Sequence, residues 1–244
     1  MSEQELIIEK YLKKFEEKFI NYVPKIPTET NHCAVIVETR RVDKMSTILK
    51  NHMYFLNQSD SNIKWGLQIF HGLDNEEYVK SITKDWKNVD YVNTGVVNFT
   101  KTSYSQYCKT PNFWNKIKSD KILIFQTDSL LLRHGIDDFL NFDYIGAPWT
   151  KPKEGTLIGN GGLSLRTKQK MIEISEKYNN ENDFTWEDIF FSKYLMGDNF
   201  PDLETAMKFS VEDVFHPKPL GVHFPIKIPI HLLDTILNNS LLNL

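Results

Sequence analysis

Short apolar runs alternate with segments of helical periodicity through the first half of this chain. The apolar runs lie at residues 33–40, 65–71 and 122–125, and the helical spacing covers residues 43–56 and 74–86. Runs of four to eight apolar residues are typical of buried strands, whereas apolar residues three or four apart indicate amphipathic helices. Strands that alternate with helices favour a parallel sheet with helices packed on it. The expected fold class is therefore α/β, with a Rossmann-like, mostly parallel central sheet.

The second half of the chain has a different character. Residues 143–149 and 161–166 have the pattern of short strands, and residues 167–178 and 186–195 that of helices. The tail after residue 209 combines short strands with proline-rich turns. No repeat or low-complexity linker separates the halves, so a single domain is the simplest prediction.

An amphipathic helix is expected at the beginning of the chain. Apolar residues recur at helical spacing within residues 3–22, and Pro24 and Pro27 end the helix. We expect residues 1–28 to form an N-terminal helix and linker, and residues 29–244 to form the α/β domain.

Composition limits the class of protein. The 244 residues carry a net charge of -3, with 41% hydrophobic and 25% charged residues, as in ordinary soluble domains. No obviously basic face is present, so nucleic acid is not expected as a partner. Cys33 and Cys108 form neither a disulfide framework nor a zinc motif, which favours a reducing, cytoplasmic location. Neither a signal peptide nor a membrane span is expected.

Two polar side chains follow the apolar run at residues 122–125, at its carboxyl end. Gln126 and Asp128 are two residues apart, so their side chains leave the same face of an extended segment. Ligands of open α/β sheets bind at this end of the strands. Such a pair can hold a divalent cation, or the ribose and diphosphate of a sugar nucleotide. A strand-end aspartate that merely starts a turn or caps a helix is the structural alternative.

Residues 159–166 are rich in glycine but match neither a dinucleotide fingerprint nor a Walker loop. Gly161 and Gly162 allow a ligand to approach the backbone closely, or form a tight turn into a strand.

Two adjacent carboxylates, Glu187 and Asp188, stand at the start of the predicted helix 186–195. Either can act as a general base on an acceptor hydroxyl. Thr185 and Asp188 also have capping-box spacing, and acidic residues are favoured at helix N-termini. The sequence does not separate the two roles.

For other residues the sequence leaves two alternative roles open. His223, in a short strand, is a structural histidine or a metal ligand beside Asp128. Arg40 and Arg166 follow strands and either face phosphates or lie solvated at the surface. Trp149 is a stacking platform for a sugar or part of the core.

Taken in order, several segments resemble an uncharacterised domain family found in bacteria, algae and large DNA viruses. That family is regarded as related to glycosyltransferases of the GT-A type. The segments that carry the resemblance are residues 125–129, 143–149, 159–166, 187–188 and 219–223.

The resemblance implies a GT-A-like fold with a half for a nucleotide sugar and a half for the acceptor. The Asp-x-Asp of typical members falls at Gln126 and Asp128, so an amide replaces the first carboxylate. Because an amide supplies no charge, only weak dependence on Mn²⁺ or Mg²⁺ is expected. Glu187 and Asp188 resemble the pair that holds the base, and His223 resembles the late metal ligand.

The expected activity is transfer of a sugar from a nucleoside diphosphate sugar, such as a UDP-sugar, to the hydroxyl of a glycan or other acceptor, with inversion. Thr39 and Arg40 would face the nucleotide, together with Gln126, Asp128 and the glycine pair 161–162. The alternative is a non-catalytic module that binds nucleotide sugars or glycans. A metal-dependent phosphoesterase is less favoured because such sites need more clustered carboxylates and histidines.

Overall fold

A mostly parallel sheet forms the centre of the protein, as the sequence predicted. The computed structural model describes residues 2–57, 62–180, 182–197 and 199–242. Within them, the main sheet has the strand order β3-β2-β1-β4-β9-β6. Strands β3, β2, β1 and β4 are parallel, and β9 is antiparallel to both β4 and β6. The bounds are β1 His32–Val37, β2 Trp65–His71, β3 Val89–Asn93, β4 Lys121–Phe125, β6 Tyr144–Gly146 and β9 Leu163–Thr167.

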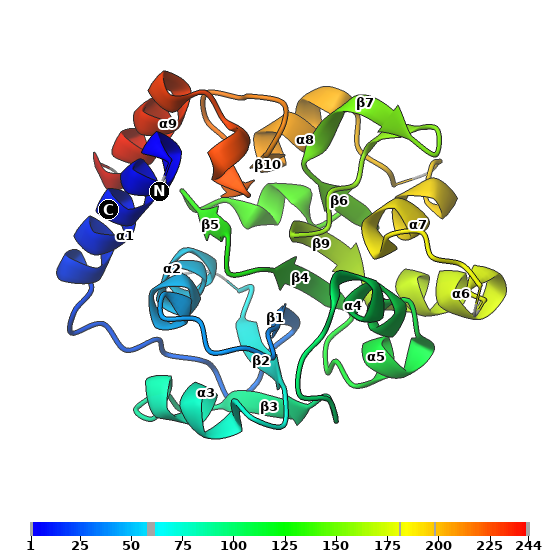
Figure 1. Ribbon diagram of the computed structural model, residues 1–244, viewed down its shortest axis with the longest axis horizontal. Helices are drawn as coiled ribbons and strands as arrows, with labels where there is room; N and C mark the ends of the chain where they lie inside the picture. The colour runs from blue at the N-terminus through cyan, green and yellow to red at the C-terminus, as the bar shows by residue number, and fades with distance from the viewer. Residues whose placement is uncertain (1, 58–61, 181, 198, 243–244) are drawn as a thin grey trace.

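Helices cover both faces of this sheet (Figure 1). Helices α1, α2 and α9 lie on one side, and α4, α5, α6 and α7 lie on the other. The bounds are α1 Glu3–Lys18, α2 Met45–Leu56, α3 Glu76–Ile82, α4 Lys101–Cys108, α5 Pro111–Asn115, α6 Lys168–Tyr178, α7 Glu187–Tyr194, α8 Leu203–Phe209 and α9 Ile230–Leu242, with short 3₁₀ helices at Ile136–Phe139 and Pro225–Lys227.

The continuous apolar strands are explained by two hydrophobic cores, one on each face. Successive side chains of a strand point to opposite faces. In β4, Leu123 and Phe125 join the core beneath α1, α2 and α9, whereas Ile122 and Ile124 join the core beneath α4 to α7. A strand buried on both faces therefore has no polar alternation.

A second, smaller sheet extends the carboxyl end of β4. It contains β10 (Ser210–Val211), β11 (Gly221–His223) and β5 (Ser129–Leu131), in that order. Because β11 pairs antiparallel with β5, His223 lies opposite Ser129, immediately after the end of β4. The remaining strands, β7 (Pro148–Lys153) and β8 (Thr156–Ile158), form a hairpin.

Two short helices, α4 and α5, stand where a single helix would otherwise connect β3 to β4. Helix α4 ends at Cys108, and α5 begins at Pro111, with the hydroxyl of Thr110 accepting a hydrogen bond from the backbone N–H of Phe113. Proline lacks a backbone N–H and fits the first position of a helix, so it starts a new helix here.

After residue 209 the predicted short strands are present as β10 and β11, but the prediction missed α9 (Ile230–Leu242). Leu233, Ile236 and Leu237 are buried in the core, at the spacing of a helix face. The Ser240 hydroxyl lies 3.2 Å from the hydroxyl of Tyr11 on α1. Helix α9 is therefore held in position by packing against α1.

Helix α1 packs on the body of the protein through one face. Its buried residues Ile8, Tyr11, Leu12 and Phe15 join the same core as β1 and β4. A domain boundary near residue 28 stays a prediction. None of the helices in the described ranges is both long and apolar enough to cross a membrane.

Candidate active site

The predicted site residues surround one cavity of about 640 Å³. It opens where β1 and β4 end, the edge at which open α/β sheets bind ligands. Its walls include nine residues that the sequence analysis assigned to a donor, a metal or a base, but neither Arg166 nor Trp149. The nine are Thr39, Arg40, Gln126, Asp128, Gly161, Gly162, Glu187, Asp188 and His223. Their individual roles stay predictions.

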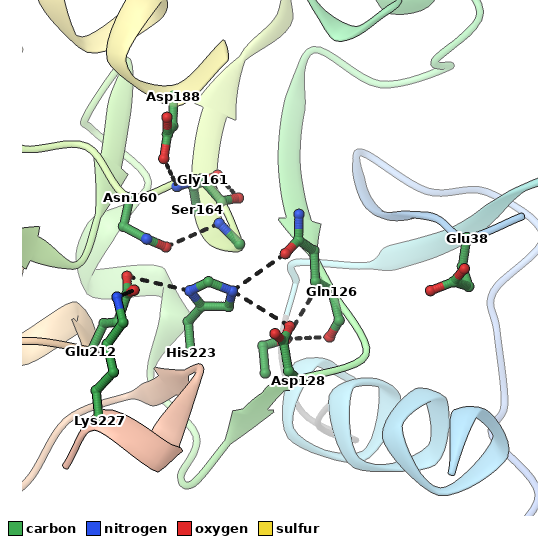
Figure 2. Close-up of polar contacts among 12 residues, drawn as sticks. Glu38, Gln126, Asp128, Asn160, Gly161, Ser164, Asp188, Glu212, His223 and Lys227 are labelled. Carbon is green, nitrogen blue, oxygen red and sulfur yellow. Dashed lines mark hydrogen bonds and ion pairs between the residues drawn. The ribbon is translucent and has the colours of Figure 1, made fainter. Parts of the chain in front are cut away.

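The imidazole of His223 lies at the centre of a polar cluster in this cavity (Figure 2). Its Nε2 is 3.4 Å from Oδ1 of Asp128 and 3.3 Å from Oε1 of Gln126. Its Nδ1 is 3.4 Å from Oε2 of Glu212, and Glu212 also pairs with Lys227. Strand pairing between β5 and β11 thus joins side chains that are far apart in the sequence.

The two carboxylates determine the protonation of His223. Desolvation by itself lowers its pKa, but the hydrogen bonds and charges of Asp128 and Glu212 outweigh it and raise the pKa to about 9. Desolvation also opposes the ionisation of Asp128, yet its bond to His223 lowers the pKa of this carboxyl below the ordinary value. In this arrangement an imidazolium is held between two carboxylates.

The groups that meet near Nε2 of His223 are of kinds that ligate a small divalent cation, provided that this nitrogen first loses its proton. Asp128 offers a carboxylate oxygen, and Gln126 turns its amide oxygen to the same point while its Nε2 lies 3.5 Å from the Tyr104 hydroxyl. Carboxylate, amide and imidazole are ligands that Mg²⁺ and Mn²⁺ accept. Across the described ranges, no three or more His, Cys, Asp or Glu side chains cluster as a metal site. The candidate set is therefore one carboxylate, one imidazole and one amide.

The two glycines make room for the protein's own side chains. A Cβ atom at Gly162 would overlap the imidazole of His223, and one at Gly161 would overlap the carboxylate of Glu187. The sequence analysis assigned this space to a ligand or a turn. The absence of a side chain lets His223 and Glu187 approach the backbone, and both glycines also line the cavity, so their contact with a ligand stays a prediction.

Arg166 and Glu187 form a buried ion pair. Nη1 of Arg166 donates to Oε2 of Glu187 at 2.6 Å, and Nη2 donates to Oε1 at 3.1 Å. The guanidinium is 1% exposed and lies 4.7 Å from the ring centroid of Tyr144. Both readings of Arg166 from the sequence, a phosphate ligand or a solvated surface residue, are therefore wrong. Both oxygens of Glu187 accept bonds from this one partner.

Asp188 is the carboxylate with the more open environment. Its Oδ2 accepts a bond from the N–H of Gly161 at 3.4 Å, and its Oδ1 accepts one from the N–H of Ile189 at 2.8 Å. Desolvation and the neighbouring charge of Glu187 raise its pKa to about 6. The N-cap of α7 is Trp186, which makes no side-chain cap bond, and the backbone N–H of Thr185 donates to Oδ1 of Asp183 at 2.8 Å. The capping box suggested by the sequence is absent.

A further carboxylate, Glu38, lines the cavity at the end of β1, apart from the His223 cluster (Figure 2). Both of its oxygens accept from Arg40, at 2.9 Å from Nε and 2.8 Å from Nη2. Asn75 holds this turn by donating to the carbonyls of residues 38 and 40. The neighbouring Thr39 donates to Oδ1 of Asn98 at 2.8 Å. The strand end is thus rigid, with the Arg40 side chain 62% exposed.

Sequence reasoning missed several residues of the cavity. Glu38 and Glu212 are carboxylates at strand ends, the same signal that selected Asp128, and weighting that signal evenly would have found them. Trp149 is 2% exposed and belongs to the interior, so the sugar-platform reading of this residue is wrong. The exposed tryptophan of the cavity is Trp186.

The solved structures that are similar to this chain include the following three. The glycosyltransferase GlyE of Streptococcus pneumoniae TIGR4 matches with a TM-score of 0.48 and 13% identity, over 85% of this chain and 63% of that chain. An active-site mutant of LgtC matches with a TM-score of 0.49 and 10% identity, over 79% and 86%. The mannosyltransferase PcManGT from Pyrobaculum calidifontis, solved with GDP-Man and Mn²⁺, matches with a TM-score of 0.49 and 10% identity, over 82% and 66%.

The chain thus spans 63% of the length of GlyE, less than two thirds. No curated protein matches the sequence significantly. A family model described as "Protein of unknown function (DUF5672)" matches residues 87–223, more than half of the chain. The matched part includes Gln126, Asp128, Glu187, Asp188 and His223. As the ordered segments predicted, this chain belongs to an uncharacterised domain family, DUF5672.

Proposed function

We propose that the protein is a glycosyltransferase that moves a sugar from a nucleoside diphosphate sugar to an acceptor hydroxyl. One observation carries the proposal. Asp188, a carboxylate whose pKa is raised to about 6, lines the same cavity as the Asp128, Gln126 and His223 cluster. A base that is ionised at neutral pH and a site suited to a charged diphosphate are the two parts that this reaction needs.

Asp188 is the base in this proposal. Its carboxylate accepts the proton of the acceptor hydroxyl as that oxygen bonds to the anomeric carbon. The bond between the anomeric carbon and the diphosphate oxygen breaks on the opposite face, so the configuration inverts. Glu187 is unsuited to this step because both of its oxygens accept bonds from Arg166. We assign Glu187 and Arg166 to holding the start of α7 and the backbone at Gly161 in place.

The donor nucleotide is assigned to the end of β1 and its diphosphate to the end of β4. Thr39 and the exposed guanidinium of Arg40 line the first part of the cavity. Gly161 and Gly162 form the wall beside the second part. Arginine recognises phosphate through paired hydrogen bonds, so Arg40 can reach the diphosphate by leaving Glu38.

Asp128, Gln126 and His223 are the residues that would hold Mn²⁺ or Mg²⁺. Such a cation would neutralise charge that grows on the departing diphosphate. Gln126 contributes no charge to the set, so we expect the dependence on metal to be weak. The Gln126 side chain still orients its oxygen toward the cation position through its contact with Tyr104.

Calorimetry with UDP and GDP tests the donor site. We expect binding with Mn²⁺ present, a smaller but measurable signal in EDTA, and weaker binding for Arg40→Ala. A control variant, Lys80→Ala, alters an exposed cation outside this cavity and should bind normally. Absence of binding for both nucleotides would contradict the donor site. Binding of nucleotide sugars without turnover would make the protein a non-catalytic module.

A further inference from the structure

Trp186 differs from the other tryptophans of the protein in its exposure. All five tryptophans fall within the described ranges. Trp65 and Trp114 are fully buried, Trp149 is 2% exposed and Trp86 is 9% exposed. Trp186 is 45% exposed and lines the cavity, two residues before the candidate base. An exposed tryptophan in the wall of a cavity offers a ligand a flat apolar face.

The backbone that precedes Trp186 is anchored by side chains of residues 105–109. Lys109, which is fully buried, donates from Nζ to the carbonyl oxygen of Asp183 at 2.6 Å. Gln106 donates to the same carbonyl at 2.6 Å, and the Ser105 hydroxyl donates to the carbonyl of Thr185 at 3.4 Å. The segment before Trp186 is therefore fixed to α4. Burial of the Lys109 ammonium costs free energy, and its hydrogen bond to the carbonyl of Asp183 offsets part of that cost.

Its place at the start of α7 also holds Trp186 close to Asp188, the candidate base. It is the N-cap of α7, and its carbonyl accepts a bond from the N–H of Phe190 at 2.8 Å. Asp188 lies in the first turn of that helix. The indole and the candidate base are thus carried by one rigid element. Lys153 and Asn160 line the same cavity and add polar partners.

We propose that the acceptor is a saccharide and that its sugar ring stacks on the indole of Trp186. This inference rests on the proposed glycosyltransferase function and names its acceptor class. A sugar ring has an apolar face of C–H groups and an edge of hydroxyls. The face matches the indole, while the edge matches the polar groups of Lys153, Asn160 and Asp188. Stacking would aim one hydroxyl at the base.

Phe184 provides a matched control in the same segment. It is 68% exposed, more than Trp186, but it does not line the cavity. Loss of either ring removes an exposed aromatic side chain from the same anchored backbone. Only the loss of Trp186 should alter acceptor binding.

Acrylamide quenching of tryptophan fluorescence measures the contact directly. The probes are the methyl glycosides of glucose, galactose, mannose and N-acetylglucosamine, added with saturating UDP or GDP. We expect at least one glycoside to reduce the quenchable fraction in the wild-type protein and in Phe184→Ala. In Trp186→Phe the accessible indole is gone and the glycoside should leave the quenching unchanged. If no glycoside protects the indole, or if a serine- and threonine-containing peptide protects it instead, the saccharide proposal is overturned.

Transfer kinetics separate this inference from the proposed function. Trp186→Ala should raise the KM for the saccharide acceptor about tenfold or more, the usual effect of truncating an aromatic anchor. Trp186→Phe should recover part of this loss, and Phe184→Ala should behave as wild type. Hydrolysis of the donor by the wild-type protein tests the proposed function by itself. Donor hydrolysis with an unchanged acceptor KM in Trp186→Ala would refute the stacking alone.

Discussion

At the scale of single residues, the environment of Asp188 distinguishes it from its neighbour. Its pKa of about 6 lies above the ordinary value of 3.8, mainly because of desolvation. The folded protein therefore binds this proton more tightly than the unfolded chain does. The resulting stability is complete below about pH 4 and is lost as the pH rises through about 6. An ionised Asp188 consequently destabilises the protein at neutral pH.

We predict that Asp188→Asn loses activity and gains stability. Loss of a positioned base typically lowers the rate by about 10² to 10⁴. Removal of the buried charge should raise the free energy of unfolding at pH 7 by on the order of 1–3 kcal/mol, with no gain at pH 4. Rate measurements and thermal melts at both pH values check this. A variant that turns over at the wild-type rate would exclude Asp188 as the base.

Glu187→Gln should behave in the opposite way. It leaves the buried guanidinium of Arg166 without its charged partner, and breaking such a pair typically costs about 3–5 kcal/mol. We therefore expect a large loss of unfolding free energy in urea titrations. Activity per folded molecule should fall less than in Asp188→Asn. A stable Glu187→Gln protein without turnover would instead make Glu187 the base.

At the scale of elements, the close approach between β9 and β11 depends on Gly162. A methyl group at this position would overlap the imidazole of His223. We predict that Gly162→Ala displaces the imidazole and weakens the effect of Mn²⁺ on nucleotide binding, as measured by calorimetry.

A double-mutant cycle is the control for this contact. With His223→Ala in the background, the methyl group has room, so Gly162→Ala should cost less free energy of unfolding than it does alone. Residues in contact commonly show interaction energies of about 0.5–3 kcal/mol. Purely additive costs would show that the two side chains do not compete for space.

Local patterns predicted some elements and missed others for physical reasons. The strand at residues 122–125 was evident because burial on both faces leaves an uninterrupted apolar run. The break between α4 and α5 also has a local cause, because Pro111 occupies the first position of α5. Helix α9 follows a proline-rich segment, and its stability comes from contact with α1 at the other end of the chain. No local pattern contains that contact.

At the scale of the whole molecule, α1 joins the core that α9 and the main sheet share (Figure 1). Phe15 is fully buried there, whereas Leu6 on the same helix is 45% exposed. We predict that Phe15→Ala lowers the free energy of unfolding by about 3–5 kcal/mol. Leu6→Ala should change it by less than about 0.5 kcal/mol. Equal, small effects in urea titrations would show that α1 is not part of the cooperative unit.

The candidate site was predictable as a set of positions but not as a set of partners. Strand ends and a helix start gave Gln126, Asp128 and Asp188, because ligand sites recur there in α/β sheets. Nothing local showed that Glu187 pairs with Arg166, since that contact depends on how α7 packs beside β9. Likewise, the anchoring of the backbone before Trp186 depends on a distant buried lysine, Lys109.

The central claim is that this cavity transfers a sugar with Asp188 as the base. The most direct measurement follows the anomeric proton of UDP- and GDP-sugars by NMR, with the wild-type protein and with Asp188→Asn. We expect the wild-type protein to consume at least one donor and to give an inverted anomeric product. Asp188→Asn should still bind that donor but consume it at least about a hundredfold more slowly. A product of retained configuration, or equal turnover by both proteins, would contradict the account.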